Sequence, residues 1–180
     1  MTTYVALLRG INVGGHKKVA MADLCELLRS LGLEEVRSLL QSGNLVFRSA
    51  GRTAAQLEGL LEEAIERRLG LQSKFFVRSN REWGAVIAGN PFRAEAERDP
   101  GRLVVMFLKE APDGGRVEAL RAAIVGPEVL HAEGRQVYVV YPNGAGTSRF
   151  THTVIEKTLG TRATGRNWNT VQKLGVLAGG

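Results

Sequence analysis

The chain of 180 residues is long enough to bury one or two hydrophobic cores, and its 44% hydrophobic and 23% charged residues are ordinary for a globular protein. Its longest apolar run, 103–108, is too short to span a membrane, and no secretory signal is expected because Arg9 interrupts the first apolar stretch. A single cysteine excludes an intramolecular disulfide and fits a reducing compartment, so we expect a cytoplasmic protein.

The net charge of +6 is concentrated near the two ends of the chain. Residues 1–20 carry +3 and residues 142–180 carry +4, whereas residues 21–141 carry −1. A basic surface attracts nucleic acid and other polyanions, although the same charge can simply keep a surface soluble. The uneven distribution therefore directs attention to the two terminal segments.

Elements of the first half follow the order strand, helix, strand, strand, helix, strand and extra helix. They are expected at 4–11, 21–31, 36–41, 45–48, 53–69, 74–78 and 79–89. Thr53 with Gln56, and Ser79 with Glu82, match the capping box that begins a helix. The acidic residues of the 53–69 helix are expected on its solvated face; they include Glu58, Glu62, Glu63 and Glu66.

The same order of elements repeats in the second half. Residues 93–101 are charged and turn-rich and are predicted to be a linker. Elements then follow at 103–108, 117–125, 129–132, 137–141, 150–159, 162–164 and 168–177. This pattern predicts an α+β fold of two tandem ferredoxin-like (α–β plait, βαββαβ) units, each followed by an extra helix, with domains at 1–92 and 102–180.

Two glycine-rich turns, 10–18 and 143–149, carry much of the basic charge and directly precede expected helices, and a third polar turn spans 165–170. Helix N-termini present unpaired N–H groups and a positive dipole, which suit an anion. The topology places the first turn at the same sheet edge as the hairpin tip 41–44, and the second turn at the same edge as 165–170. If these edges face each other, one cleft between the units gathers all four segments.

The residues predicted to bind the anion contribute side chains or backbone amides from these turns. They are Arg9, Asn12, Gly14, Gly15, Lys17, Gln41, Ser42, Asn44, Gly144, Gly146, Ser148, Arg149, Arg166, Asn167, Asn169 and Lys173. Nucleic acid, a nucleotide or another phosphorylated small molecule remains open as the ligand. The alternative function is an enzyme for a small phosphorylated or carboxylate substrate, with His16 or His152 as the acid–base group.

Other site motifs fit poorly. The segment from Gly10 to Gly15 is followed by His16 rather than Lys, and no Ser or Thr follows Lys18, so a phosphate-binding loop of nucleoside triphosphatases is disfavoured. The histidines lack metal-ligand spacing, and no metal or cofactor is expected. An RNA-recognition module needs exposed stacking aromatics, and only Tyr4 and Phe47 are candidates. Cys25 lies on an apolar helix stripe and is expected to be buried.

Three segments of the chain resemble the signature of a bacterial family, domain of unknown function 1697. They are 4–15, 41–47 and 166–171, and Asn90-Pro91-Phe92, Val137-Tyr138 and Glu156-Lys157 fit it as well. The resemblance covers about residues 3–178. It implies two ferredoxin-like units, no established activity and no assigned catalytic residues. Gly165 departs from the pattern, because the family usually has Thr or Ser before the arginine, which puts a hydroxyl contact there in question.

Overall fold

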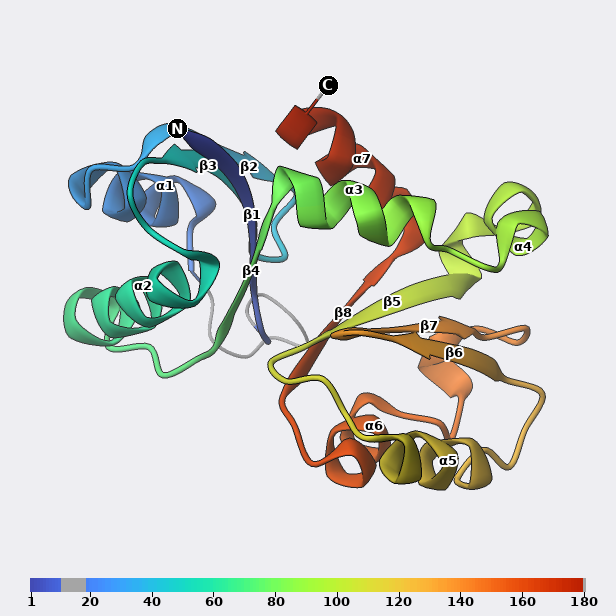
Figure 1. The fold of residues 1–180 in the computed structure, drawn as a ribbon. Coiled ribbons are helices and arrows are strands. Elements are labelled where there is room, and N and C mark those ends of the chain that lie inside the picture. Colours follow the sequence, from blue (N-terminus) through green and yellow to red (C-terminus); the bar gives the residue numbers. More distant parts are fainter. Residues whose placement is uncertain (11–18, 180) are drawn as a thin grey trace. The chain divides into compact units, whose positions relative to one another are not determined.

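The computed structural model describes residues 1–10 and 19–179, which form two four-stranded antiparallel sheets with their helices (Figure 1). The strand orders are β2-β3-β1-β4 and β6-β7-β5-β8. In each sheet the first strand of the unit is central and the fourth is at an edge, as a βαββαβ unit requires. The α+β fold of two ferredoxin-like units predicted from the sequence is confirmed.

Elements of the first unit occur in the expected order. They are β1 (Thr2–Leu8), α1 (Met21–Ser30), β2 (Glu34–Leu39), β3 (Asn44–Ser49), α2 (Ala54–Leu69), β4 (Phe75–Ser79) and α3 (Asn80–Ala88). Helices α1 and α2 cover one face of the sheet (Figure 1). Ala6 and Leu8 of β1 pack into the core on that face, whereas the alternating Val5 and Leu7 are buried on the other.

Both capping boxes predicted for this unit are present. The Gln56 amide donates to the Thr53 hydroxyl over 3.1 Å and the Thr53 amide donates to the Gln56 side chain over 2.9 Å. Ser79 and Glu82 make the same reciprocal pair at 3.1 and 2.7 Å. These bonds satisfy amides that the first helical turn leaves unpaired, and they fix where α2 and α3 begin.

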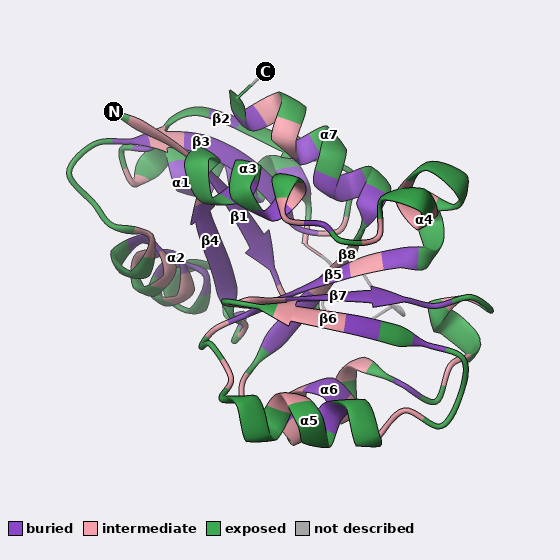
Figure 2. Cartoon of the chain, turned by 45° about the vertical axis from the view of Figure 1, so that its right-hand side comes forward, coloured by how far each residue is buried: buried purple, intermediate pink, exposed green. Residues whose placement is uncertain are grey.

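The second unit repeats this order. Its elements are β5 (Leu103–Leu108), α5 (Gly114–Ala122), β6 (Val129–Glu133), β7 (Gln136–Val140), α6 (His152–Leu159), β8 (Ala163–Asn167) and α7 (Trp168–Gly179). Helix α5 begins three residues before the predicted start at 117, because the Asp113 carboxylate accepts from the Arg116 amide at 2.8 Å and caps the helix there. Strands β5 and β7 are largely buried (Figure 2).

The segment predicted as a linker is helical instead. Residues 93–101 contain α4 (Arg93–Arg98) and most of the 3-10 turn η1 (Pro100–Arg102). Asn90 is buried, and its side-chain oxygen accepts from the Phe92 amide at 3.0 Å, which forms the turn that leads into α4. Charged and turn-forming residues therefore form a short helix here, and the role of 93–101 as a linker between two domains stays a prediction.

The chain divides into two compact units, 1–85 together with 173–180, and 86–172. These boundaries fall inside α3 and α7, whereas the sequence pattern places them on either side of 93–101. Within the second unit the Tyr138 hydroxyl donates to the Val86 carbonyl at 2.6 Å, and within the first Arg37 donates to the Leu177 carbonyl at 2.7 Å. The C-terminal part of α3 thus belongs to the second compact unit, and the C-terminal part of α7 belongs to the first. The order of elements alone would assign each helix to the unit that it follows.

None of the helices formed by residues 1–10 and 19–179 is both long enough and apolar enough to cross a bilayer.

Candidate functional site

The first unit gathers basic residues at the sheet edge where β1 ends and β3 and β4 begin. The Leu8 amide donates to the Gly43 carbonyl at 2.8 Å, and the Arg9 amide donates to the Lys74 carbonyl at 3.0 Å. The Ser73 hydroxyl donates to the Arg9 carbonyl. The end of β1, which Arg9 follows, therefore lies beside the 41–44 hairpin tip. The 10–18 turn that the topology predicts at this edge lies, apart from Gly10, outside the described residues. We call Arg9 and Lys74 the basic edge of the first unit.

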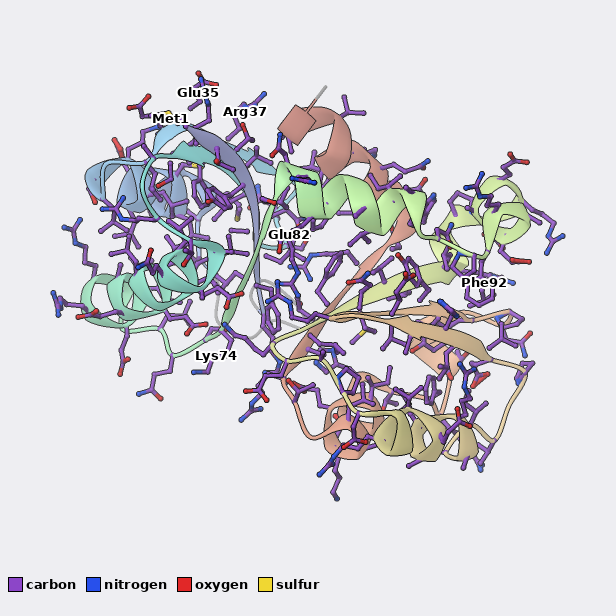
Figure 3. The ribbon with its side chains drawn as sticks, viewed as in Figure 1. Met1, Glu35, Arg37, Lys74, Glu82 and Phe92 are labelled. Carbon is purple, nitrogen blue, oxygen red and sulfur yellow. The ribbon has the colours of Figure 1, made fainter. Side chains whose placement is uncertain are left out.

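Lys74 lies at the start of β4, and Figure 3 shows it at the end of the sheet away from Glu35 and Arg37. Its side chain is 53% exposed, and its ammonium is 4.0 Å from the nearer oxygen of Glu62. At that distance and exposure the carboxylate offsets only part of the lysine charge. Lys74 was not predicted as a site residue, because its segment contains no glycine turn.

Asn44 positions the hairpin tip. It is fully buried, and its amide nitrogen donates to the Leu39 carbonyl at 3.0 Å and to the Ser42 hydroxyl at 3.1 Å. These bonds satisfy polar groups that burial would otherwise penalise. Gln41 is exposed and Ser42 is half-buried at the same tip. Ligand contacts by these three residues stay predictions.

Two glutamates expected on the solvated face of α2 instead cover the open side of β4. Glu58 accepts from the Val77 amide and Glu62 from the Phe75 amide, each at 2.8 Å. Their side chains are only 12% and 20% exposed. An edge strand otherwise presents unpaired amides, so these carboxylates complete its hydrogen bonding. The solvated-face prediction is wrong for this pair because the helix lies over the sheet edge.

The second unit repeats the basic edge at equivalent positions. The Leu108 amide donates to the Arg135 carbonyl at 2.8 Å, and the Lys109 amide donates to the Arg162 carbonyl at 3.0 Å. Lys109 thus corresponds to Arg9, and Arg162 corresponds to Lys74. We call Lys109, Arg135 and Arg162 the basic edge of the second unit. Aligning the two halves of the sequence on their strands could have found these residues.

The second glycine turn lies at the opposite edge of the second sheet, beside the end of β8. Strands β7 and β8 both run antiparallel to β5, with Val140 opposite Leu103 and Asn167 opposite Val104. The predicted sharing of one edge by 143–149 and 165–170 is therefore confirmed. The turn does not open the next helix, however, because residues Ala145–Thr147 form the 3-10 turn η2 and Thr151 caps α6.

A carboxylate lies against this turn. The Ser148 hydroxyl donates to Glu128 at 2.9 Å, and Glu128 is only 8% exposed. The negative charge of Glu128 repels an anionic ligand that would bind at Ser148. The anion contacts predicted for Gly144, Gly146, Ser148 and Arg149 stay predictions, and the structure adds Glu128 to the groups that a ligand there would meet.

Arg166 lies half-buried at the end of β8 and bonds to its own strand. It donates to the Thr164 hydroxyl at 2.7 Å and to the Gly165 carbonyl at 2.8 Å. Burial of its guanidinium lowers the pKa of that group to about 10, so it stays charged at neutral pH. Thr164 thus supplies a hydroxyl contact to Arg166, although Gly165, the residue directly before the arginine, has no side chain. A Cβ at Gly165 would lie 2.7 Å from the sulfur of Met106, which accounts for glycine there.

The remaining predicted residues near β8 have structural positions. The Asn167 side chain accepts from the Thr170 amide at 3.1 Å and caps α7. Asn169 and Lys173 are exposed on α7. Four predicted contacts in the first glycine turn, Asn12, Gly14, Gly15 and Lys17, lie outside the described residues, as does His16. The shared cleft expected from the sequence stays a prediction.

His152, the other histidine considered for catalysis, is paired on α6. Its Nε2 lies 3.0 Å from an oxygen of Glu156, whose second oxygen accepts from the Ala163 amide at 2.9 Å. Glu156 thus covers the open side of β8 as Glu58 and Glu62 cover β4. The enzyme hypothesis stays a prediction. Over residues 1–10 and 19–179, no cluster of His, Cys, Asp and Glu is suited to a metal ion.

The aromatic residues considered for base stacking are in the core. Tyr4 and Phe47 are buried beneath α1 and α2, with ring centroids 6.0 Å apart, and the Tyr4 hydroxyl donates to the Arg52 carbonyl at 2.8 Å. Neither ring can stack on a base in this position. Cys25 is also buried, as predicted.

These sheets and edges define a two-unit α+β protein of the ferredoxin-like type. The chain belongs to the family of proteins of unknown function DUF1697, whose model matches residues 1–138. A solved structure, that of the conserved bacterial protein SP0830 from Streptococcus pneumoniae, is similar over 98% of both chains, with 30% identity and a TM-score of 0.77. No curated protein matches the sequence. The resemblance noted from the sequence motifs is confirmed.

Proposed function

We propose that the protein binds a phosphate-bearing ligand, a nucleotide or a nucleic acid, through the basic edges of its units. One observation carries the proposal: two equivalent positions are basic in both units. The first follows the central strand, at Arg9 and Lys109, and the second precedes the edge strand, at Lys74 and Arg162. The bonds that align these strands are made by backbone atoms, so they do not themselves select a cation at either position.

The charge of these edges supports an anionic ligand. Arg162 and Lys74 are exposed, and Arg9, Lys109 and Arg135 are half-buried. Arginine guanidinium groups form paired hydrogen bonds with phosphate oxygens, and lysine adds a compact positive charge. Cations gathered at one edge also attract a polyanion, whose binding is favoured because it releases counterions.

The buried aromatic rings favour phosphate recognition over base recognition. Because Tyr4 and Phe47 lie in the core, the first sheet lacks the stacking platform by which RNA-recognition modules read bases. A nucleic acid would therefore be held through its backbone, with strong salt dependence and weak sequence preference. A nucleotide would be held by one edge and would show a milder salt dependence.

The test is fluorescence anisotropy of labelled single-stranded RNA, labelled single-stranded DNA and labelled ATP at two salt concentrations. We expect binding of at least one probe to weaken in the double variants Arg9→Gln/Lys74→Gln and Lys109→Gln/Arg162→Gln. The matched control is Arg67→Gln/Arg121→Gln, which removes the same charge from exposed helix positions. If the edge variants bind every probe as the control does, the proposal fails.

A further inference from the structure

The second unit contains a hollow of about 300 Å³ that lies away from its basic edge. One side is formed by residues 125–128, which follow α5, and the other by residues of the 143–149 turn, which follows β7. Among the residues that line the hollow, Glu128 has a carboxylate, Ser148 a hydroxyl and Arg149 a guanidinium group. Glycines 126 and 144 also line it, so backbone is open to close approach there.

Glu128 is a buried carboxylate, and one of its two oxygens accepts a hydrogen bond. It is 8% exposed, and one oxygen accepts from the Ser148 hydroxyl at 2.9 Å. Ser148 is itself fixed, because its oxygen also accepts from the Phe150 amide at 2.9 Å. Within the ranges 1–10 and 19–179, no cation lies within ion-pair distance of Glu128. Because the residue is largely removed from water, a donor that reaches the second oxygen would stabilise the carboxylate.

Glu128 lines the hollow, and its second oxygen lies beside Gly126. A Cβ at Gly126 would lie 2.7 Å from this oxygen, so the glycine makes room for the carboxylate. The nearby phenol cannot complete it, since the Tyr141 hydroxyl donates to the Phe150 carbonyl at 2.9 Å. Burial, and secondarily the charge of Glu128, raises the pKa of Tyr141 to about 12. The carboxylate therefore keeps an acceptor for a group that enters from solvent.

Arg149 supplies the opposite charge on the same hollow. It is exposed and, within the part of the chain that the structure covers, forms no ion pair with Glu128. An anion and a cation that share a hollow without contacting each other suit a ligand that bridges them. We propose that this hollow binds a free α-amino acid, with its ammonium group on Glu128 and its carboxylate on Arg149. The residues of this site are not those of the basic edges, and the proposal does not depend on them.

The test is isothermal titration of the whole protein with each of the twenty common L-amino acids, followed by titration with propylamine and propionate. We expect at least one amino acid to bind and both single-charge probes to bind at least about tenfold more weakly, because each keeps only one charged contact. Glu128→Gln keeps an acceptor for Ser148 and is expected to weaken the amino acid by about tenfold or more. Gly126→Ala, which displaces the carboxylate, is expected to weaken it too.

The matched control is Glu118→Gln, which removes the same charge from an exposed position on α5. Thermal unfolding of each variant separates loss of the ligand contact from loss of the fold. Absence of binding by all twenty amino acids overturns the proposal, as does equal affinity in Glu128→Gln and Glu118→Gln. Equal binding of propylamine and the amino acid removes the role of Arg149 and overturns the zwitterion assignment.

Discussion

The amide of Arg9 donates to the carbonyl of Lys74 at 3.0 Å, and this bond brings together two cations that are 65 positions apart in the sequence. The bond aligns the end of β1 with the start of β4, so the antiparallel pairing itself places both side chains at one edge. The second unit uses the same bond between Lys109 and Arg162. In each unit, a backbone hydrogen bond that the fold requires thus places two cations next to each other.

Salt dependence should report how many of these cations bind phosphate. If a nucleic-acid strand is the ligand, removing one cation that binds phosphate is expected to lower the slope of log K against log salt by about 0.7 to 0.9. Arg9→Gln/Lys74→Gln should therefore reduce the slope by up to about 1.8, whereas Arg67→Gln/Arg121→Gln leaves it unchanged. Anisotropy titrations from low to moderate salt measure both slopes. Equal slopes in the two double variants would exclude phosphate binding at this edge.

Removal of Glu58 tests the cover of β4. Glu58→Ala removes the acceptor of the Val77 amide and an ion-pair partner 3.8 Å from the buried Arg78. We expect the free energy of unfolding to fall by about 1–3 kcal/mol, because buried polar groups lose a partner. Glu63→Ala serves as control, since the Glu63–Arg67 pair is largely exposed and its loss should cost less than about 0.5 kcal/mol. Urea denaturation distinguishes them, and equal losses would show that Glu58 is not a structural cap.

The order of elements could be predicted because it depends on local patterns. The apolar run in 103–108 and the capping boxes at Thr53 and Ser79 are short-range signals that tertiary packing did not overrule. The start of α5 was missed by three residues because Asp113 was not recognised as its cap. The short helix in 93–101 could not be predicted, because charged and turn-forming residues suit both a loop and a short exposed helix.

The composition of the site depends on long-range pairing and could be predicted only in part. Topology correctly placed the end of β1 beside the 41–44 tip, since strand direction alone determines which loops share an edge. It did not reveal Lys74 or Arg162, because these residues carry no turn motif. The burial of Glu128 and the partial burial of Arg166 could not be predicted, because both depend on which side chains pack around them, and periodicity does not encode that.

Alkaline pH should destabilise the second unit through two buried tyrosines. Burial is the main reason that the pKa of Tyr138 is raised to about 12, and the same holds for Tyr141. Below pH 10 both states keep these protons, and as pH rises from 10 toward 12 the unfolded chain loses them first. Stability therefore falls over this window, by no more than about 3 kcal/mol for each tyrosine.

The measurement is urea denaturation between pH 8 and 11.5 for the wild type and for Tyr138→Phe. The variant loses the hydroxyl bond to the Val86 carbonyl, so it should be less stable by about 1 kcal/mol at pH 8. Its stability should then fall less steeply above pH 10, because one of the two titrating groups is gone. Parallel curves for the two proteins would show that Tyr138 does not titrate differently in the folded state.

Leu40, which directly precedes the 41–44 hairpin tip, has a strained backbone conformation that a substitution should relieve. Its φ is 60° and its side chain is 54% exposed, so a bulky residue adopts a left-handed conformation without gaining burial. That conformation costs an ordinary L-residue about 1–2 kcal/mol, and asparagine tolerates it better. Leu40→Asn is therefore expected to raise the free energy of unfolding by about 1 kcal/mol. Leu40→Ala is the control, because it removes the exposed apolar group and keeps the strain. Urea denaturation should show a gain for asparagine alone, and an equal gain for alanine would attribute the effect to hydrophobic exposure rather than to the backbone.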